Sequence, residues 1–344
     1  MGSIPPAGTI SPICRSHLED QPSQPSHQAS PTHTSRPDLL LVNPAAGGGL
    51  AREIVPDLQR FLAERRWQAQ PEMTESAEDF AQKAVHAARA GRQRIIAVGG
   101  DGTFQLLLNA VRDFPQTTLG IIPAGGGNDL AASLGLPHNP IAAAALVMRG
   151  ETCALDAVRV RTSEGNERLY TGGGGVGLDA EAARYASGRF RNLRGRSRYL
   201  LSAIRALAGF HAVRATITAG DGEATLQIEK ALVACVLNTP SFGAGLALAP
   251  NAKTDDGVLD LVVLEDLSLW EILGMLPKLA SRGELSTPHI SRRPVTRVRI
   301  ETDPPRPFQG DGEILGTTPV DISVVPRACQ VLRAPRTNSS SGRV

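Results

Sequence analysis

Short apolar runs alternate with amphipathic segments in the first half of the chain. The apolar runs are 39–42, 95–98 and 119–122. Segments at about 51–65, 76–88 and 104–111 place apolar side chains at three- and four-residue spacing, which predicts helices. Continuous apolar strands separated by helices are typical of a parallel sheet that helices cover on both faces. We therefore expect an α/β, Rossmann-like parallel-sheet domain in this half.

The pattern changes beyond about residue 150, where strands follow one another without regular intervening helices. The expected strands are 158–160, 213–218, 232–237, 259–264 and 295–300. This order predicts a mainly antiparallel second domain, a β-sandwich or a barrel. Helical stretches at 199–208 and 269–280 interrupt it, and a final strand at 320–325 could belong to either domain.

The two ends of the chain differ from the rest. Residues 1–36 are dominated by Pro, Ser, His, Gln and Thr without an apolar period, and 335–344 are similarly loose, so we expect two disordered tails. Between the tails we place an α/β domain at 37–150, completed by 318–334, and a β-rich domain at 151–317.

Composition excludes several classes of protein. The chain has 344 residues, 41% of them hydrophobic, and a net charge of +2, which favours neither nucleic acid nor an acidic partner. No apolar run is long enough to span a membrane, and the amino terminus lacks the pattern of a signal peptide. Cys14, Cys153, Cys235 and Cys329 lie far apart without metal-ligand spacing, so we expect free thiols in a reducing cytoplasm.

Each apolar run of the first half ends in a glycine-rich loop. The loops are Asn43-Pro44-Ala45-Ala46-Gly47-Gly48-Gly49, Gly99-Gly100-Asp101-Gly102-Thr103 and Pro123-Ala124-Gly125-Gly126-Gly127-Asn128-Asp129. A strand, a glycine loop and a helix bring backbone N–H groups up to a phosphate, at the edge of the sheet where ligands bind. A carboxylate would repel that phosphate, so Asp101 is best explained with a metal ion between them. The loops predict a nucleotide site, although neither the dinucleotide fingerprint nor the P-loop motif is present.

Two carboxylates stand one residue apart in Asp311-Gly312-Glu313. If they point to the same side after a strand, their repulsion would raise one pKa toward the range of a general base. The alternative is a plain Asp-Gly hairpin turn. The residues alone leave both open.

Together these motifs resemble the diacylglycerol kinase catalytic-domain family, which includes sphingosine and ceramide kinases and bacterial soluble lipid kinases. Further matches are Gly177-Leu178-Asp179-Ala180, Ala252-Lys253-Thr254-Asp255-Asp256-Gly257 and Leu279-Ala280-Ser281-Arg282-Gly283-Glu284. The likeness runs in family order over about 38–332 and is strongest to the bacterial enzymes. It implies a kinase of phospholipid biosynthesis that uses ATP and Mg²⁺ and transfers the γ-phosphate to a hydroxyl of diacylglycerol or a related lipid.

The resemblance also implies roles for single residues. Glu313 matches the general base, and Asp311 and Asp101 join it as catalytic residues. The nucleotide contacts would be Asn43, Pro44, Ala45, Ala46, Gly47, Thr74, Gly99, Gly100, Asp101, Gly102, Thr103, Gly125, Gly126, Asn128 and Asp129. Lys253, Asp256 and Val258 match a Mg²⁺ site away from the reacting phosphate, with a solvated turn as the alternative. Leu106 and Gly126 depart from the family, which usually has Glu and Thr there.

An arginine-rich segment suggests how a lipid acceptor is reached. Six arginines lie between Arg184 and Arg198, beside the apolar helical stretch, and anionic membranes attract such clusters. We expect a cytoplasmic protein that contacts the inner face of the membrane there, binds no nucleic acid and could form a homodimer. A solvated basic loop is the alternative for the segment. An NAD kinase-like phosphotransferase and an inactive lipid-binding regulatory module are the alternatives for the function.

Overall fold

The computed structural model describes residues 36–187, 212–220, 224–243, 245–265 and 288–335, with a few single positions between them. Both predicted tails therefore lie almost wholly outside the described residues, as do most of the helical stretches predicted at 199–208 and 269–280. No helix in the described part is long and apolar enough to cross a membrane. The described cysteines, Cys153, Cys235 and Cys329, are free thiols as predicted.

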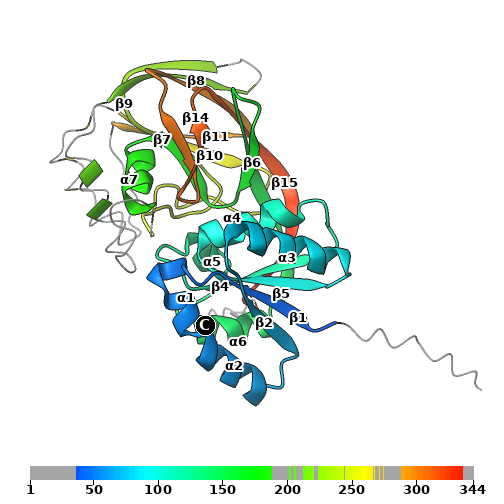
Figure 1. Ribbon diagram of the computed structural model, residues 1–344. Coiled ribbons are helices and arrows are strands. Elements are labelled where there is room, and N and C mark those ends of the chain that lie inside the picture. Colours follow the sequence, from blue (N-terminus) through cyan, green and yellow to red (C-terminus); the bar gives the residue numbers. More distant parts are fainter. Residues whose placement is uncertain are drawn as a thin grey trace, which may run out of the picture. The chain divides into compact units, whose positions relative to one another are not determined.

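Parallel strands form the first part of the fold (Figure 1). They are β1 (Asp38–Val42), β2 (Ala69–Met73), β3 (Arg94–Gly99) and β4 (Thr118–Pro123), in the order β4-β3-β1-β2. Every pair among them is parallel, with Leu41 level with Ala97 of β3 and Glu72 of β2. The central strands are apolar and buried because helices cover both of their faces.

Helices connect these strands. They are α1 (Leu50–Glu53), α2 (Val55–Glu64), α3 (Ala77–Arg89), α4 (Asp101–Val111), α5 (Asp129–Ser133) and α6 (Pro140–Met148). Figure 1 shows α3 and α4 on one face of the parallel strands and α2 and α6 on the other. Ser76 caps α3 by accepting from the N–H of Asp79 at 3.1 Å. The single helix predicted over 51–65 is instead two, because the chain begins a new helix at Val55 with Pro56 in its first turn.

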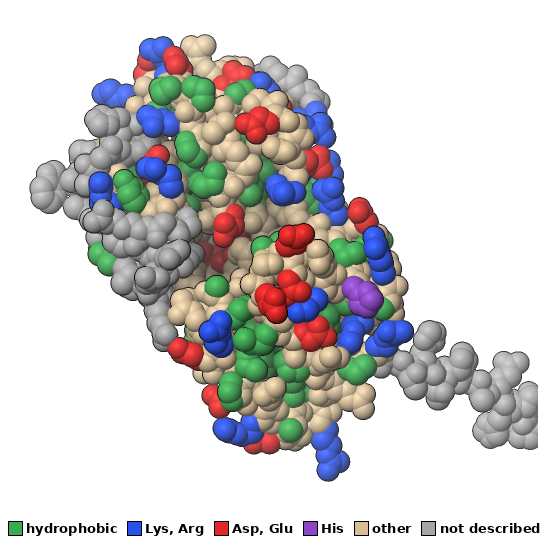
Figure 2. All heavy atoms as spheres, viewed as in Figure 1, with side chains coloured by type: hydrophobic (Ala, Val, Ile, Leu, Met, Phe, Trp, Pro, Cys, Tyr) green, Lys and Arg blue, Asp and Glu red, His purple; other side chains and the backbone are tan. Residues whose placement is uncertain are grey.

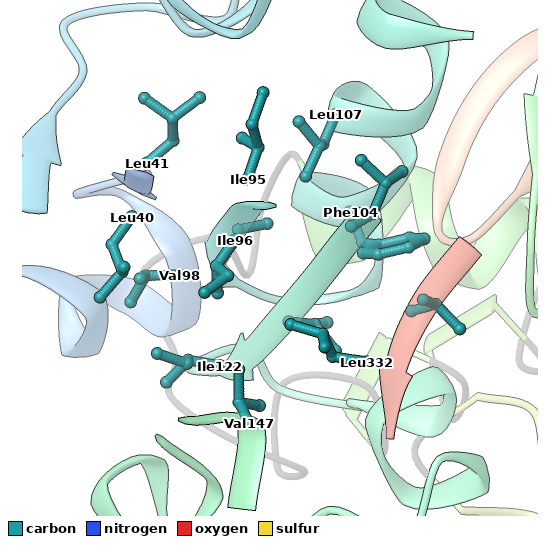
Figure 3. Packing of buried hydrophobic residues seen from close by; sticks show 14 of the residues in the cluster. Leu40, Leu41, Ile95, Ile96, Val98, Phe104, Leu107, Ile122, Val147 and Leu332 are labelled. Carbon is teal, nitrogen blue, oxygen red and sulfur yellow. The ribbon is translucent and has the colours of Figure 1, made fainter. Parts of the chain in front are cut away.

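One hydrophobic core lies between the sheet and these helices (Figure 3). Neighbouring Ile95 and Ile96 of β3 point to opposite faces of the strand, Ile95 toward Leu107 of α4, and all three side chains are buried completely. Leu332, from near the carboxyl end of the chain, packs in the same core. The final strand therefore contributes to the α/β part.

Antiparallel strands form the second part. They are β5 (Glu151–Thr162), β6 (Glu167–Tyr170), β7 (Gly173–Gly177), β8 (Val213–Ala219), β9 (Ala224–Leu237), β10 (Leu259–Glu265), β11 (Ile290–Val295), β12 (Arg297–Asp303), β13 (Pro307–Gly310) and β14 (Glu313–Thr317). Their order, β14-β13-β7-β9-β8-β12, continues into the last strand, β15 (Val320–Arg333). Helix α7 (Leu178–Ser187) follows β7. The predicted fold class, a parallel α/β part followed by mainly antiparallel strands, is confirmed.

The strand β15 joins the two parts. Its first residues pair antiparallel with β12, and Gln330 and Val331 near its end pair parallel with β4. Along most of its length it also pairs with β5, with a bulge between Val325 and Cys329. Because β5 and β15 run through both parts, the domain boundaries at 150 and 317 stay predictions.

Candidate nucleotide and phosphotransfer site

The three glycine loops and the Asp311–Glu313 segment line one cavity of about 640 Å³. Figure 2 shows a hollow between the helical part and the β-rich part, with acidic side chains inside it. The predicted residues in its lining are Asn43, Ala45, Ala46, Gly47, Gly100, Asp101, Gly102, Thr103, Gly125, Gly126, Asp311 and Glu313. Pro44, Thr74, Gly99, Asn128, Asp129 and the predicted metal residues Lys253, Asp256 and Val258 are not in the lining. The loops thus meet at the carboxyl edge of the parallel sheet, where the sequence places the nucleotide site.

Close backbone contacts hold the first and third loops together. Gly47 has a φ of 63°, and a Cβ there would lie 2.2 Å from the carbonyl oxygen of Ala124. Because real Cβ atoms do not come so close to backbone, only glycine fits at this position. The first loop is also tied to the second, since Asn43 Nδ2 donates to Thr103 Oγ1 at 3.1 Å.

The second and third loops meet in the same way. A Cβ on Gly125 would lie 2.5 Å from the Cα of Gly100. Asn128, in the left-handed region with a φ of 60°, accepts from the N–H of Gly125 and donates to its carbonyl oxygen, both at 3.0 Å. Asn128 therefore shapes the loop from behind the cavity surface, which explains its absence from the lining.

Two other predicted contacts lie behind the loops. Thr74 is buried, and its hydroxyl donates to the carbonyl oxygen of Val42 at 2.9 Å. Gly99 packs against Thr103, whose Oγ1 would lie 2.3 Å from a Cβ at residue 99. Both residues support the loops rather than face the cavity.

Asp101 opens α4 and holds α5 in place. Its carboxylate oxygens accept from the N–H groups of Asp129 and Leu130, each at 3.1 Å. Burial and the neighbouring carboxylates of Asp129 and Asp311 raise the pKa of Asp101 to about 7. Asp129 is itself buried and accepts from Ser241 Oγ at 2.7 Å. The Asp101 carboxylate thus has a structural task besides the metal contact that the sequence predicts.

Asp311 and Gly312 form a two-residue hairpin turn between β13 and β14. Their φ angles are 50° and 87°, as in the turns that suit hairpins. The carboxylate of Asp311 accepts from the N–H groups of Thr171, Gly172 and Gly173 at 2.9, 2.8 and 3.2 Å. The backbone here is therefore the Asp-Gly hairpin turn that the sequence analysis gave as the alternative. The Asp311 side chain anchors this turn to the segment before β7.

The pKa of Asp311 is raised by burial rather than by the repulsion from Glu313 that the sequence predicts. Burial raises the pKa of Asp311 to about 6, its backbone hydrogen bonds partly offset this, and Glu313 is not among the causes. The reason is geometric: Asp311 faces backbone N–H groups, whereas Glu313 is exposed at the cavity. A Cβ on Gly102 would lie 3.3 Å from Glu313 Oε1, so this carboxylate faces the first turn of α4.

Helix α4 connects the two walls of the cavity. Gln105 Nε2 donates to the carbonyl oxygen of Gly310 at 3.3 Å, next to the turn. One turn later, the amide of Asn109 donates to the carbonyl oxygen of Leu169 at 2.7 Å and accepts from its N–H at 3.0 Å. Asn109 was missed by the sequence reasoning, although two amides four residues apart on an apolar helix are a usable signal.

A second missed residue is Arg168 of β6. Among the described residues that line the cavity it has the one cationic side chain, whereas the acidic ones are Asp101, Asp311 and Glu313. Leu106, where the family usually has Glu, lines the same cavity. The lining therefore has an apolar side chain at residue 106, where the family usually has a carboxylate.

The predicted metal loop lies apart from the cavity lining. Asp256 is exposed, and its Oδ1 accepts from the N–H of Val258 at 3.1 Å. Fully buried Asp156 supports the loop by accepting from the N–H of Gly257 at 2.7 Å. In the part of the chain that the structure describes, no group of three or more His, Cys, Asp and Glu side chains could hold a metal ion. The set Lys253, Asp256 and Val258, with one carboxylate and two carbonyls, stays a prediction.

Comparison with known proteins agrees with this fold. A family model described as diacylglycerol kinase catalytic domain matches residues 37–160, and one described as YegS C-terminal NAD kinase beta sandwich-like domain matches 174–333. These matches define a kinase-type phosphotransferase. The chain belongs to the diacylglycerol kinase catalytic-domain family, which confirms the resemblance.

Individual relatives cover nearly all of the described fold. A diacylglycerol kinase of Mycobacterium tuberculosis is 31% identical over 85% of this chain and 94% of its own. One of Bacillus subtilis is 29% identical over 81% of this chain and 90% of its own. The crystal structure of a putative diacylglycerol kinase from Bacillus anthracis superposes with a TM-score of 0.68 at 25% identity, covering 87% of this chain and 98% of that one.

Proposed function

We propose that the protein is an ATP-dependent lipid kinase that transfers the γ-phosphate to a hydroxyl of diacylglycerol or a related lipid. One observation carries the proposal: the exposed carboxylate of Glu313 lies beside the first turn of α4, in a cavity lined by three glycine loops. This arrangement supports a phosphate donor at the loops and a base beside it that can act on a hydroxyl.

The loop wall suits a nucleotide triphosphate. The first turn of α4 leaves backbone N–H groups without acceptors inside the helix, and these attract phosphate oxygens. Glycines at residues 47, 100 and 125 let the backbones of the three loops pack closely around this turn. Arg168 adds a positive charge to the lining of the same cavity.

The hairpin wall suits the acceptor. Glu313 accepts the proton of the lipid hydroxyl while the hydroxyl oxygen forms a bond to the γ-phosphorus. The bond from that phosphorus to the bridging oxygen breaks, and ADP leaves with the electron pair. Anchoring of the turn by Asp311 keeps Glu313 within reach of the hydroxyl.

The residues present fit the Mg²⁺ that the family resemblance implies. Burial and then two neighbouring carboxylates raise the pKa of Asp101, and a divalent cation would offset that concentration of negative charge. We expect Asp101 to hold it, and Lys253, Asp256 and Val258 to hold a second ion outside the cavity. When bound, the ion neutralises charge on the phosphates.

The acceptor is proposed to reach the site from a membrane surface contacted by the Arg184 to Arg198 region, at the inner face in the cytoplasm. Arg184 itself pairs with Glu181 at 2.8 Å, and residues 188–200 lie outside the described residues. Membrane contact, like the homodimer and the absence of nucleic acid as a partner, stays a prediction.

The test is the partition of label from γ-³²P-ATP among dioleoylglycerol micelles, a total lipid extract and NAD. We expect label in a lipid, no label in NAD, and no transfer when EDTA exceeds Mg²⁺. Glu313→Gln protein purified in the same way controls for a contaminating kinase. Label in NAD alone supports the NAD kinase alternative. Liposome binding without transfer to any lipid supports an inactive module.

A further inference from the structure

A buried chain of hydrogen bonds runs from α7 to the turn that precedes Glu313. Gln309 Nε2 donates to Asp179 Oδ2 at 2.9 Å, and Gln309 Oε1 accepts from the N–H of Gly312 at 2.9 Å. Gln309 is 1% exposed. Its amide therefore has one orientation that satisfies both ends, because the carboxylate only accepts and the N–H only donates.

Strand β7 lacks side chains where this chain of bonds passes. A Cβ on Gly175 would lie 2.7 Å from Asp179 Oδ2, and one on Gly174 would lie 2.6 Å from the carbonyl oxygen of Gln309. Any larger residue would push the pair apart. The glycines of β7 thus leave the space in which Asp179 and Gln309 meet.

Asp179 is an unfavourable residue to bury unless it serves the structure around it. Burial raises its pKa to about 6, and the bond from Gln309 offsets part of that rise. The titratable groups beside it are Tyr170 and Cys235, whose own pKa values are raised, mainly by burial, so both side chains stay neutral. An apolar pair could fill the same space but could not hold the N–H of Gly312.

Neither Asp179 nor Gln309 lines the cavity. The hydrogen bond between them leads to the turn, which Asp311 anchors from its other side through Thr171 and Gly172. The turn is therefore held at two points, its first residue by a side chain of its own and its second by Gln309.

We propose that Asp179 and Gln309 are positioning residues, which fix the Asp311–Gly312 turn so that Glu313 faces the first turn of α4. The proposal rests on the proposed function only for the kinetic effect. The hold on Gly312 is a property of the structure and can be measured without any substrate.

The experiment compares full-length Gln309→Ala, Asp179→Ala, Asp179→Asn and the double alanine variant with the parent. Loss of one buried bond that aims a catalytic group should lower kcat about tenfold in either alanine variant. The KM for ATP should stay within about twofold of the parent's, since these changes leave the binding of ATP itself unaffected. Asp179→Asn should keep most of kcat, because its amide oxygen can accept the same bond. The double variant should be no slower than the slower single variant, because both changes break one chain of bonds.

Thr302→Val is the matched control. It removes a side-chain hydrogen bond to Thr318, at the other end of the β13–β14 hairpin from the turn. It should lower stability without lowering kcat. Parent-like kcat in Gln309→Ala, multiplying losses in the double variant, or an equal loss in Thr302→Val would each overturn the proposal.

The rate of hydrogen exchange in the peptides that cover 307–317 tests the hold on Gly312 without any substrate. Exchange should be faster in Gln309→Ala and Asp179→Ala than in the parent, and parent-like in Asp179→Asn and in the peptides of β1 and β3. If Gln309→Ala does not fold, the two Asp179 variants carry the test. If the parent phosphorylates no lipid, the proposed function fails, and unchanged exchange at 307–317 is then the result that overturns this inference.

Discussion

The two walls of the cavity are built by opposite means. On the nucleotide wall, glycines such as Gly47 and Gly125 bring backbone against backbone, and the surface offers main-chain groups. On the hairpin wall, buried carboxylates bind backbone N–H groups, and the side chain of Glu313 is presented to the cavity. The first wall is therefore sensitive to added atoms, and the second to lost hydrogen bonds.

The largest effect is expected from an added atom on the nucleotide wall. Gly47→Ala and Gly49→Ala both place alanine at positive φ, at 63° and 99°. Only residue 47 is obstructed, because its Cβ would meet the Ala124 carbonyl oxygen at 2.2 Å while that of residue 49 meets nothing within 4 Å. We expect about 100-fold weaker ATP binding in Gly47→Ala from overpacking and strain, against a few-fold in Gly49→Ala. Calorimetric titration with ATP measures both, and equal losses would mean that backbone strain alone matters.

Removal of the cationic side chain that lines the cavity should have the next largest effect. Arg168→Ala is expected to raise the KM for ATP about tenfold with a small change in kcat, because one charge-assisted contact to the nucleotide is lost. Arg161→Ala is the control, since Arg161 is exposed on neighbouring β5, pairs with Glu167 at 2.9 Å and does not line the cavity. A kcat loss with unchanged KM would move Arg168 from nucleotide binding to the chemical step.

A smaller change in kcat should come from a methyl group that presses on the Glu313 carboxylate. In Gly102→Ala the new methyl lies 3.3 Å from Glu313 Oε1, so the carboxylate must shift by a few tenths of an ångström. We expect kcat to fall several-fold and thermal stability to hold, because alanine suits a helix better than glycine. Steady-state kinetics beside a melting curve checks this. A stable variant with parent kcat would mean that Glu313 does not act from this position.

The smallest effect concerns pH. The pKa of Asp179 is about 6 in the folded protein, against the usual 3.8, so the folded protein binds this proton more tightly than the unfolded chain does. The contribution of this group to stability is therefore lost as pH rises from about 4 through 6. Asp179→Asn should therefore flatten the fall in melting temperature between about pH 4.5 and pH 7 in ligand-free protein. Parallel curves for parent and variant would place the ionisation elsewhere.

The sequence predicted the nucleotide wall better than the hairpin wall. The loops were found because strand, glycine and helix are neighbours in sequence, whereas the contact of Gln309 with Asp179 joins residues that are far apart in the chain. The same limit explains why the burial of Asp311 was not predicted, since its partners lie before β7. Strand β2 was missed because its Gln70 and Glu72 break the apolar pattern, and α6 because it is apolar nearly all round and has no helical period.

The division of labour between the two walls is tested most directly by measuring kcat and the Kd for ATP on the same preparation of Glu313→Gln. A base acts on the acceptor and not on the nucleotide, so kcat should fall about 1,000-fold while the Kd for ATP stays within about twofold of the parent's. An activity within about tenfold of the parent's, or a loss of ATP binding as large as the loss of kcat, would contradict the account.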